Sequence, residues 1–385
     1  MRKYLRLGLL LLPLLMLWGC PPSQSAKKMP PLFIITNALD TGKEPSFLVT
    51  KDFDLDKNLD LVVLNSGDHT FSYFRGNGDG SFKDPVVFKT GADPICITVA
   101  DFNTDGFPDL AELNYRDQSV QIFLNTGHGG FKSMGEVLHP GKIPINLVAG
   151  DFNEDGIPDL AVSLRYHKVA ILIGKGAGYF NDPVTVPMRG QPTGLVIDDY
   201  NGDQHTDVAV ALAGSGNVGV QILWGKGDGQ FEPSQLFRGG GQPLTIVNID
   251  ANGDGWTDLV TSSNSLHAMT TVMNNGDGTF KSLRDFAAGE FPKFVAASDF
   301  DGDGNVDLVV SNATQDTISV TLGRGDGTFV YPPVNHYVDE YPQGIAVGDF
   351  NKDNLMDIAV SCRDKNLLLI LTKKNLQRAS LPTAS

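Results

Sequence analysis

One nine-residue pattern occurs seven times along the chain at nearly constant spacing, and it limits the possible folds more than any other feature. Successive copies begin 48 to 51 residues apart, at Asp52, Asp101, Asp151, Asp199, Asp250, Asp299 and Asp349. The ninth position is an aspartate in every copy. A period of about 20–50 residues is typical of repeat architectures in which each copy is one supersecondary unit.

The pattern also indicates a metal site. Oxygen-bearing side chains stand at positions 1, 3, 5 and 9, as in Asp299, Asp301, Asp303 and Asp307. Carboxylates this close together repel one another unless a hard cation neutralises them, and Ca²⁺ binds about 6–8 oxygen ligands. A backbone carbonyl near position 7 would add a ligand, and Gly304 at position 6 allows a sharp turn. The segment that follows, 308–311, is typical of a strand and carries no Glu at position 12, which distinguishes the loop from an EF-hand.

The predicted metal ligands form seven sets, one for each copy. Position 3 is an aspartate in two copies and an asparagine in five, so an oxygen ligand is kept while the charge is reduced. The sets are Asp52, Asp54, Asp56 and Asp60; Asp101, Asn103, Asp105 and Asp109; Asp151, Asn153, Asp155 and Asp159; Asp199, Asn201, Asp203 and Asp207; Asp250, Asn252, Asp254 and Asp258; Asp299, Asp301, Asp303 and Asp307; and Asp349, Asn351, Asp353 and Asp357. Because Lys57 and Gln204 replace glycine at position 6, we expect copies one and four to bind metal least well.

The net charge agrees with this interpretation. Of the 45 acidic residues, 23 occupy positions 1, 3, 5 and 9 of the seven copies. Seven bound Ca²⁺ ions would add 14 positive charges to a chain whose formal charge is −15. The acidity is therefore better explained by metal ligands than by a solvated acidic face, and it argues against binding of nucleic acid.

Two further marks repeat in phase with the metal pattern and divide each copy into strands. A proline, which is tolerated at the first residue of a strand, lies seven residues before each copy, at Pro45, Pro94, Pro144, Pro192, Pro243, Pro292 and Pro342. A glycine-rich turn typical of a hairpin ends at Phe82, Phe131, Phe180, Phe231, Phe280 and Phe329. In the second copy the four expected strands are 94–100, 110–114, 120–124 and 131–138.

These strands predict an all-β fold, because the mature chain shows no sustained helical period. Four strands in about 50 residues match one blade of a β-propeller, so we predict seven four-stranded blades. The last copy offers only two strands after its metal pattern, 358–362 and 367–372. The N-terminal segment 32–37 can supply the missing outer strand, which would close the ring and remove an exposed edge.

The repeated Asp-Phe-Asn-x-Asp-Gly-x-x-Asp-Leu pattern and the Gly-x-Gly-Asp-Gly-x-Phe turns resemble the FG-GAP/VCBS repeat family, which is also found in the propellers of integrin α-subunits. The resemblance extends over residues 32–372. It implies a Ca²⁺-binding propeller and does not specify an activity, because propellers have many functions.

The N-terminus is typical of an exported lipoprotein. Basic residues precede an apolar run from Leu7 to Trp18 that is too short to span a membrane, and Gly19-Cys20 resembles a lipobox. An ordinary signal peptide with an incidental cysteine is the alternative. We therefore predict a signal peptide (1–19), a lipidated Cys20 with a flexible tether (20–31), the propeller (32–374) and a polar tail (375–385). Because Pro21 rather than Asp follows the cysteine, we expect the outer membrane, with the lipid anchor as the membrane contact.

Cys96 and Cys362, the two remaining cysteines, fall in copies two and seven, which are not adjacent in sequence. Both lie in apolar strand patterns. We expect them to be buried thiols rather than a disulfide.

The connections between the second and third strands are the least repetitive part of the chain and carry the candidate ligand-binding residues. They would lie on the face opposite the metal loops. Aromatic, basic and imidazole side chains there could bind a glycan or a protein: Tyr115, Arg116, Arg165, Tyr166, His167, His267 and Arg363. These side chains could equally be polar because loops are solvated.

Signals for catalysis are weak, since the chain contains no nucleophile elbow, zinc-protease or P-loop motif. The first hypothesis is therefore a non-catalytic binding, adhesion or scaffold module without catalytic residues. The alternative is a secreted, Ca²⁺-dependent polysaccharide lyase that would use Arg165, Tyr166 and His167. A purely structural role in the cell envelope is the third hypothesis.

Overall fold

The computed structural model describes residues 33–127, 129–214, 219–263, 266–287 and 289–373. The predicted signal peptide, Cys20, the tether and the C-terminal tail lie outside the described residues. Within the described ranges, no helix has the length and apolar character needed to cross a membrane.

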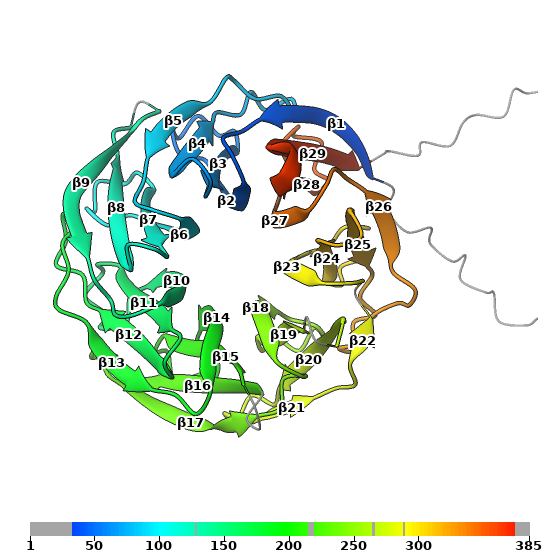
Figure 1. The fold of residues 1–385 in the computed structure, drawn as a ribbon. Helices are drawn as coiled ribbons and strands as arrows, with labels where there is room; N and C mark the ends of the chain where they lie inside the picture. Colours follow the sequence, from blue (N-terminus) through cyan, green and yellow to red (C-terminus); the bar gives the residue numbers. More distant parts are fainter. Residues whose placement is uncertain (1–32, 128, 215–218, 264–265, 288, 374–385) are drawn as a thin grey trace, which may run out of the picture. The chain divides into compact units, whose positions relative to one another are not determined.

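Seven antiparallel sheets form the blades of a ring, which confirms the predicted seven-bladed β-propeller (Figure 1). Blade one contains β2 (Pro45–Lys51), β3 (Asp60–Asn65), β4 (Thr70–Phe74) and β5 (Val86–Lys89). Blade two contains β6 (Pro94–Ala100), β7 (Asp109–Asn114), β8 (Ser119–Asn125) and β9 (Phe131–Leu138). Blade three contains β10 (Pro144–Gly150), β11 (Asp159–Leu164), β12 (Lys168–Leu172) and β13 (Val184–Pro187).

The other blades repeat this order from the centre of the ring outward. Blade four contains β14 (Gln191–Asp198), β15 (Asp207–Ala213), β16 (Gly219–Gly225) and β17 (Phe231–Phe237). Blade five contains β18 (Pro243–Ile249), β19 (Asp258–Ser263), β20 (Ala268–Asn274), β21 (Phe280–Ser282) and β22 (Phe286–Ala287). Blade six contains β23 (Pro292–Ser298), β24 (Asp307–Asn312), β25 (Thr317–Thr321) and β26 (Val334–Tyr337). Blade seven contains β27 (Pro342–Gly348), β28 (Asp357–Cys362), β29 (Leu367–Lys373) and β1 (Phe33–Asp40).

The repeated prolines mark the innermost strands as predicted. Six of these strands begin at the proline itself, and β14 begins one residue earlier, at Gln191. The second strand of every blade begins at the ninth residue of the metal pattern, as β3 does at Asp60. Together, proline and aspartate therefore determine where the metal loop lies in each blade.

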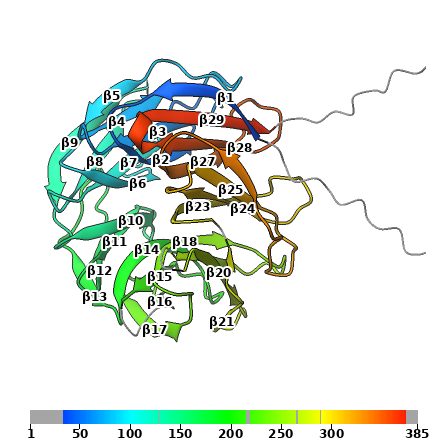
Figure 2. The ribbon, with the colours of Figure 1, turned by 45° about the vertical axis from the view of Figure 1, so that its right-hand side comes forward.

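The N-terminal strand closes the ring as expected. β1 pairs antiparallel with β29, and Phe33 lies opposite Lys373 at one end of the ladder. Figure 2 shows β1 beside β29 at the outer edge of blade seven. The strand is longer than the predicted 32–37, because pairing continues to Asp40 opposite Leu367.

In several blades the outermost strand begins later than predicted, because it does not start at the phenylalanine that ends the glycine-rich turn. In blades one, three and six, Phe82, Phe180 and Phe329 form only isolated bridges. Pro85, Pro183 and Pro333 follow these bridges, and the outer strands β5, β13 and β26 begin just after them. A proline cannot donate to the ladder, so pairing resumes only beyond it.

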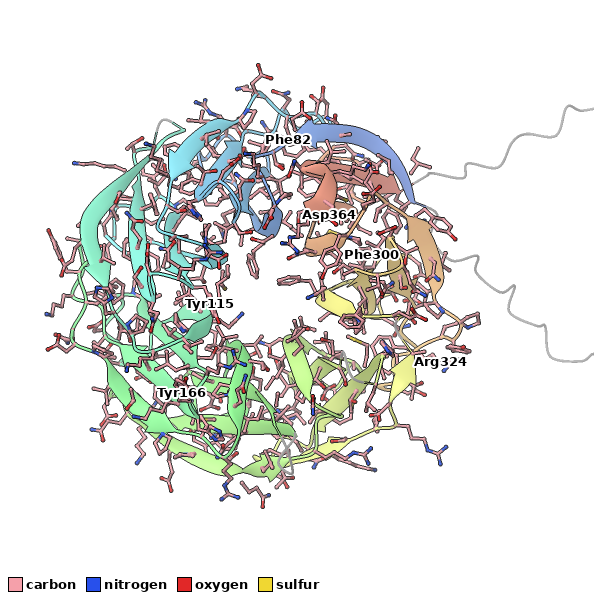
Figure 3. All side chains as sticks on the ribbon, viewed as in Figure 1. Phe82, Tyr115, Tyr166, Phe300, Arg324 and Asp364 are labelled. Atoms are coloured by element: carbon pink, nitrogen blue, oxygen red, sulfur yellow. The ribbon has the colours of Figure 1, made fainter. Side chains whose placement is uncertain are left out.

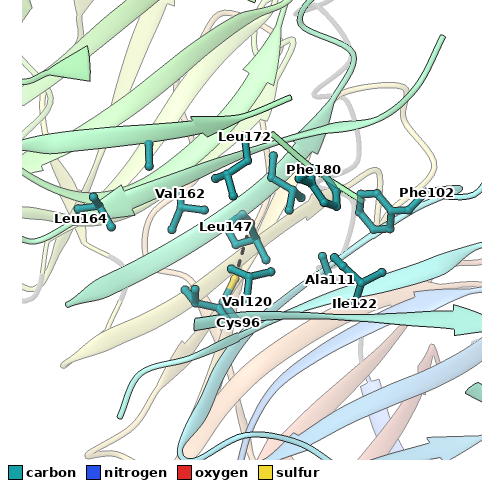
Figure 4. Packing of buried hydrophobic residues seen from close by; sticks show 13 residues of the cluster. Cys96, Phe102, Ala111, Val120, Ile122, Leu147, Val162, Leu164, Leu172 and Phe180 are labelled. Atoms are coloured by element: carbon teal, nitrogen blue, oxygen red, sulfur yellow. Dashed lines mark hydrogen bonds between the residues drawn. The ribbon is translucent and has the colours of Figure 1, made fainter. Parts of the chain in front are cut away.

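The hydrophobic core is divided among the seven contacts between neighbouring blades. The second strand of each blade is buried along its whole length, apart from Ala213 at the end of β15, because another blade covers each side of it. Figure 4 shows the cluster between blades two and three, where Cys96 donates to the Leu147 carbonyl at 3.7 Å. Cys96 and Cys362 are both free and buried, in agreement with the prediction.

Candidate metal loops and the opposite face

The seven metal loops share one backbone conformation. Residues at position 4 have φ between 59° and 78°, and those at position 6 have φ between 64° and 89°. Lys57 and Gln204 take this left-handed conformation with φ of 70° and 71°. The backbone of loops one and four therefore does not differ from that of the other loops. The left-handed conformation still costs a residue with a Cβ about 1–2 kcal/mol.

Hydrogen bonds within each loop hold the predicted ligand side chains over the turn. In loop six, Asp299 accepts from the N–H of Asp303 at 3.2 Å and of Gly304 at 2.8 Å. Asp301 accepts from the Asp303 N–H at 3.0 Å, and Asp303 accepts from the Asn305 N–H at 2.8 Å. In every other loop, the side chain at position 1 also accepts a hydrogen bond from the backbone N–H of position 6. The side chain at position 3 likewise accepts one from the backbone N–H of position 5.

Two of the loops bring three carboxylates close enough to share one ion. Oxygens of Asp52, Asp54 and Asp60 lie within 4.8 Å of one another, as do oxygens of Asp299, Asp301 and Asp307. Two ligands of one Ca²⁺ can be at most about 5 Å apart, since each lies about 2.3–2.6 Å from the ion. These are the two loops with an aspartate at position 3. In the other five, an asparagine Oδ1 accepts the equivalent bond from position 5.

The ninth aspartate is more than a ligand candidate, because it is buried and its carboxylate organises the blade. In blade six, Asp307 accepts from the Phe300 N–H at 2.8 Å and from the Gly323 N–H at 2.8 Å. Burial raises the pKa of Asp307 to about 6, while these two bonds act in the opposite direction. An ionised carboxylate has about four acceptor sites. Asp307 can therefore keep both bonds and still face a cation.

The next blade along the ring holds each metal loop at position 2. The position 2 carbonyls of Phe350, Phe102, Phe152 and Ala251 accept from the N–H groups of Gly80, Gly178, Gly229 and Gly327 at 2.9–3.0 Å. Asn125 and Asn274 replace this bond with side-chain bonds of 2.8 Å to Phe53 and Tyr200. The position 2 ring also meets the turn aromatic of that next blade, as in Phe152 and Phe231 at 5.3 Å. The glycine-rich turns thus join each metal loop to the neighbouring blade.

In blade seven, strand β1 rather than a glycine-rich turn contacts the metal loop of the preceding blade. Phe33 meets Phe300 edge to face at 5.7 Å, so an aromatic of β1 stands where the turn aromatic stands elsewhere. Sequence patterns located the turn aromatics but did not reveal what they contact. Their nearly constant spacing, 29 to 32 residues after the first aspartate of the metal pattern, was the available signal.

Two charged contacts near the loops were also missed. Arg75 lies 3.9 Å from Asp54 and brings a cation to loop one, where the sequence had drawn attention to Lys57. His205 of loop four pairs with Glu154 of loop three. The hydrogen bond to Glu154 raises the pKa of His205. This pair is a second link between neighbouring metal loops.

Substitutions at positions 5 and 9 of loop six are expected to differ in their dependence on metal. Asp307→Ala leaves two buried N–H donors without an acceptor and should cost roughly 2–5 kcal/mol with or without Ca²⁺. Asp303→Ala removes an exposed carboxylate and should lower stability mainly when Ca²⁺ is present. Thermal melting of both variants in Ca²⁺ and in EDTA measures this difference. Equal losses for the two variants in EDTA would contradict it.

The far face, defined as the side of the ring opposite the metal loops, is formed by two kinds of connection. One joins the second and third strands of a blade, and the other joins neighbouring blades. Side chains of the connections within a blade accept hydrogen bonds from backbone N–H groups of the connections between blades. His69 Nδ1 accepts from the Asp93 N–H at 3.1 Å, and Asp117 accepts from the Ala92 N–H at 2.6 Å. Asp68, Gln118, His267, Gln315, Asp316 and Asn366 make bonds of the same kind. Many polar residues of these variable loops therefore stabilise the ring.

The seven predicted ligand residues lie on the far face of blades two, three, five and seven. Figure 3 labels Tyr115 and Tyr166, which come from neighbouring blades. Arg116 pairs with Asp93 at 3.5 Å, and His267 Nδ1 accepts from the Phe291 N–H at 3.1 Å. Arg363, in the 3₁₀ turn Arg363–Lys365, pairs with Glu44 at 2.9 Å and lies over the Tyr341 ring. Arg165, Tyr166 and His167 are consecutive and exposed.

The fold and the loops define a class of protein: a seven-bladed β-propeller with an acidic loop in each blade, two of which bring three carboxylates close enough to share a cation. A family model described as an FG-GAP-like repeat matches residues 52–112, 113–162, 151–210, 199–261, 250–310 and 299–360. The chain belongs to this family.

Solved structures extend the likeness in fold. BBS1N in complex with ARL6DN aligns with a TM-score of 0.65 at 11% identity, over 90% of this chain and 98% of that one. A catalytically inactive virginiamycin B lyase from Staphylococcus aureus with quinupristin aligns with a TM-score of 0.58 at 12% identity, over 89% and 99%. A search of curated protein sequences finds no significant match. At these identities the likeness concerns the fold alone.

Proposed function

We propose that the propeller is a non-catalytic binding module, stabilised by Ca²⁺, that presents its far face to a glycan or protein ligand. The observation that carries the proposal is the distribution of the candidate residues. They are spread over four blades, and several are held by ion pairs or backbone bonds, as Arg116 and His267 are. A dispersed and rigid face suits recognition of an extended ligand better than it suits catalysis at one point.

Calcium is the cation that the loops favour. Every predicted side-chain ligand is a carboxylate or amide oxygen, which are donors for hard cations. Mg²⁺ requires nearly ideal octahedral geometry at about 2.0–2.1 Å and keeps several waters, whereas Ca²⁺ accepts a crowded and irregular oxygen shell. Loop six, with three grouped carboxylates and a glycine at position 6, is expected to bind most tightly. Loop one has the same grouping but carries Lys57 at position 6 and Arg75 at 3.9 Å from Asp54, which oppose a cation there.

The proposal includes an anchor. A lipid on Cys20 would attach the chain to the outer membrane through the tether of residues 20–31, as the lipobox-like sequence suggests. Incorporation of a labelled fatty acid into the native chain, and its loss in Cys20→Ser, would test this. Release of the Cys20→Ser chain from the membrane fraction is the expected companion result.

The binding proposal is tested with the full chain carrying Cys20→Ser, so that no lipid interferes. Immobilised protein is exposed to a glycan panel and to envelope proteins, in Ca²⁺ and in EDTA. We expect a ligand that is retained in Ca²⁺ and recovered unchanged. The solved relatives include a complex between two proteins and a lyase, so propellers serve both purposes. Cleavage of a bound polysaccharide, lost in Arg165→Ala, would favour the lyase alternative instead.

A further inference from the structure

We propose that the far face of blade three binds an acidic polysaccharide through a basic patch made of Lys142, Arg165, Tyr166, Lys168 and Arg189. The inference rests on the proposed function, because it assigns a ligand class to one part of the same face. It is carried by the local charge, by the absence of internal pairing and by the shape of the surface.

The charge of the patch is opposite to that of the chain. The three segments that meet at this end of blade three, 138–143, 164–168 and 185–190, contain no aspartate or glutamate, although the formal charge of the chain is −15. The corresponding loops of blades one, two, six and seven each carry an aspartate, at Asp68, Asp117, Asp316 and Asp364. In blades one and two that carboxylate accepts a backbone N–H bond. The shorter loop of blade three has the sequence Arg165-Tyr166-His167 in its place.

The cations of the patch are also free of internal partners, in contrast to those of other blades. On the same face, Lys43 lies 3.8 Å from Asp68, Arg116 lies 3.5 Å from Asp93, and Lys365 lies 3.0 Å from Glu340. Within the described part of the chain, Lys142, Arg165, Lys168 and Arg189 form no ion pair. Their charges are therefore available to a ligand.

His167 differs from its counterparts in the same way. His69 and His267 precede the third strands of blades one and five, and each uses Nδ1 to accept the N–H of the residue before a proline. In blade three the corresponding residue, Gln191, already belongs to strand β14. The His167 ring makes no such bond within the described residues, and its side chain is exposed beside the patch.

The surface between these residues is hollowed and partly apolar. A cavity of about 230 Å³ is lined by Pro140, Lys142, Leu164, Tyr166, Lys168 and Thr185. Leu164 is 4% exposed and forms its floor, whereas Tyr166 is 61% exposed. The volume is below the range of about 300–1,000 Å³ usual for small-molecule pockets. One ring of a longer chain that continues over the surface fits these dimensions better than an enclosed ligand does.

An acidic sugar satisfies both parts of this surface. The apolar face of its ring can pack on Tyr166, and its carboxylate can pair with Arg165 or with the two lysines. Arginine suits a carboxylate because its planar group donates two parallel hydrogen bonds. Repeated uronate residues are therefore the ligand class that we assign.

The test compares binding of a uronate polymer, polygalacturonate, with binding of neutral dextran by the full chain carrying Cys20→Ser in Ca²⁺. We expect retention of polygalacturonate alone, with affinity that falls as salt is raised from 50 to 150 mM. Tyr166→Ala and the double variant Arg165→Ala/Lys168→Ala should each weaken binding at least tenfold. The control variants on other blades, Lys43→Ala, which removes a cation paired with Asp68, and Tyr337→Ala, which removes an exposed tyrosine, should change it less than threefold. Thermal melting of each variant checks that the ring is intact.

Equal binding of dextran, or unchanged affinity in folded blade three variants, would overturn the assignment. If envelope proteins bind while polygalacturonate does not, the ligand class is wrong and the binding module stands. If polygalacturonate is cleaved and cleavage is lost in the blade three variants, the ligand class stands and the non-catalytic function is wrong.

Discussion

Removal of metal with EDTA should lower the melting temperature of the protein by on the order of 10 °C, and excess Ca²⁺ should restore it. A ligand at about 100 times its Kd that binds only the folded state contributes roughly 2.7 kcal/mol per site. Two such sites, the number of loops with three grouped carboxylates, would give about 5 kcal/mol. Each kcal/mol changes the melting temperature by about 2–4 °C in domains of roughly 150–250 residues, and by somewhat less in a larger domain such as this propeller.

The effect should be cooperative over the ring, because each metal loop also contacts the next blade. Gly80 of blade one donates to Phe350 of blade seven at 2.9 Å, and their turn and loop rings, Phe82 and Phe350, lie 5.8 Å apart. Loss of a cation therefore disturbs two blades. Scanning calorimetry in EDTA, in Ca²⁺ and in Mg²⁺ measures the change, with Mg²⁺ expected to restore little of it. An unchanged melting temperature in EDTA for a folded sample would remove the case for structural calcium.

Much of the fold could be predicted from the sequence, because the prolines and aspartates at which strands begin recur at the same spacing in every copy. Pro94 fixes the start of β6, and Asp109 fixes the start of β7 directly after the loop. Seven such pairs determine the blade number, and an incomplete last copy implies that β1 must supply its outer strand. The outer strands were less predictable. Their limits depend on single prolines such as Pro183 and on pairing with only one neighbour.

The candidate sites were predicted less completely, because side-chain roles depend on partners far away in sequence. The pattern identified Asp307 as a ligand but not as the acceptor of two buried N–H bonds. It identified His267 as a binding candidate, whereas the fold places its ring against the Phe291 N–H. The basic patch of blade three required Lys142, in the connection between β9 and β10, to meet Lys168, the first residue of β12. A search for motifs within one loop cannot detect this.

Glu112 breaks the pattern of the core in a way that the repeat makes visible. It is the fourth residue of β7, a position occupied in other blades by a valine in five cases and by Thr261 in one. Its side chain is 0% exposed. One carboxyl oxygen accepts from the Asn114 amide at 2.8 Å, and the other has no hydrogen-bond partner among the described residues. Burial raises the pKa of Glu112 well above its usual value.

Glu112→Gln is therefore expected to stabilise the protein at neutral pH and to change its response to pH. Since the carboxyl of Glu112 stays protonated in the folded chain above pH 4.5 and ionises in the unfolded chain, stability is lost as the pH rises toward the raised pKa. The gain in the variant should grow by about 1.4 kcal/mol per pH unit over that window and vanish near pH 4. Gln can still accept the bond from Asn114.

The measurement is denaturant unfolding of the wild type and the variant at matched Ca²⁺, at several pH values from 4 to 8. Taking the difference between the two chains cancels the titration of the metal-loop aspartates, which both chains share. Glu136→Gln is the matched control: Glu136 lies on β9 of the same blade and its side chain is exposed, so its removal should leave the pH dependence unchanged. A stability difference for Glu112→Gln that is constant with pH would show that Glu112 is ionised in the folded protein and would contradict the raised pKa.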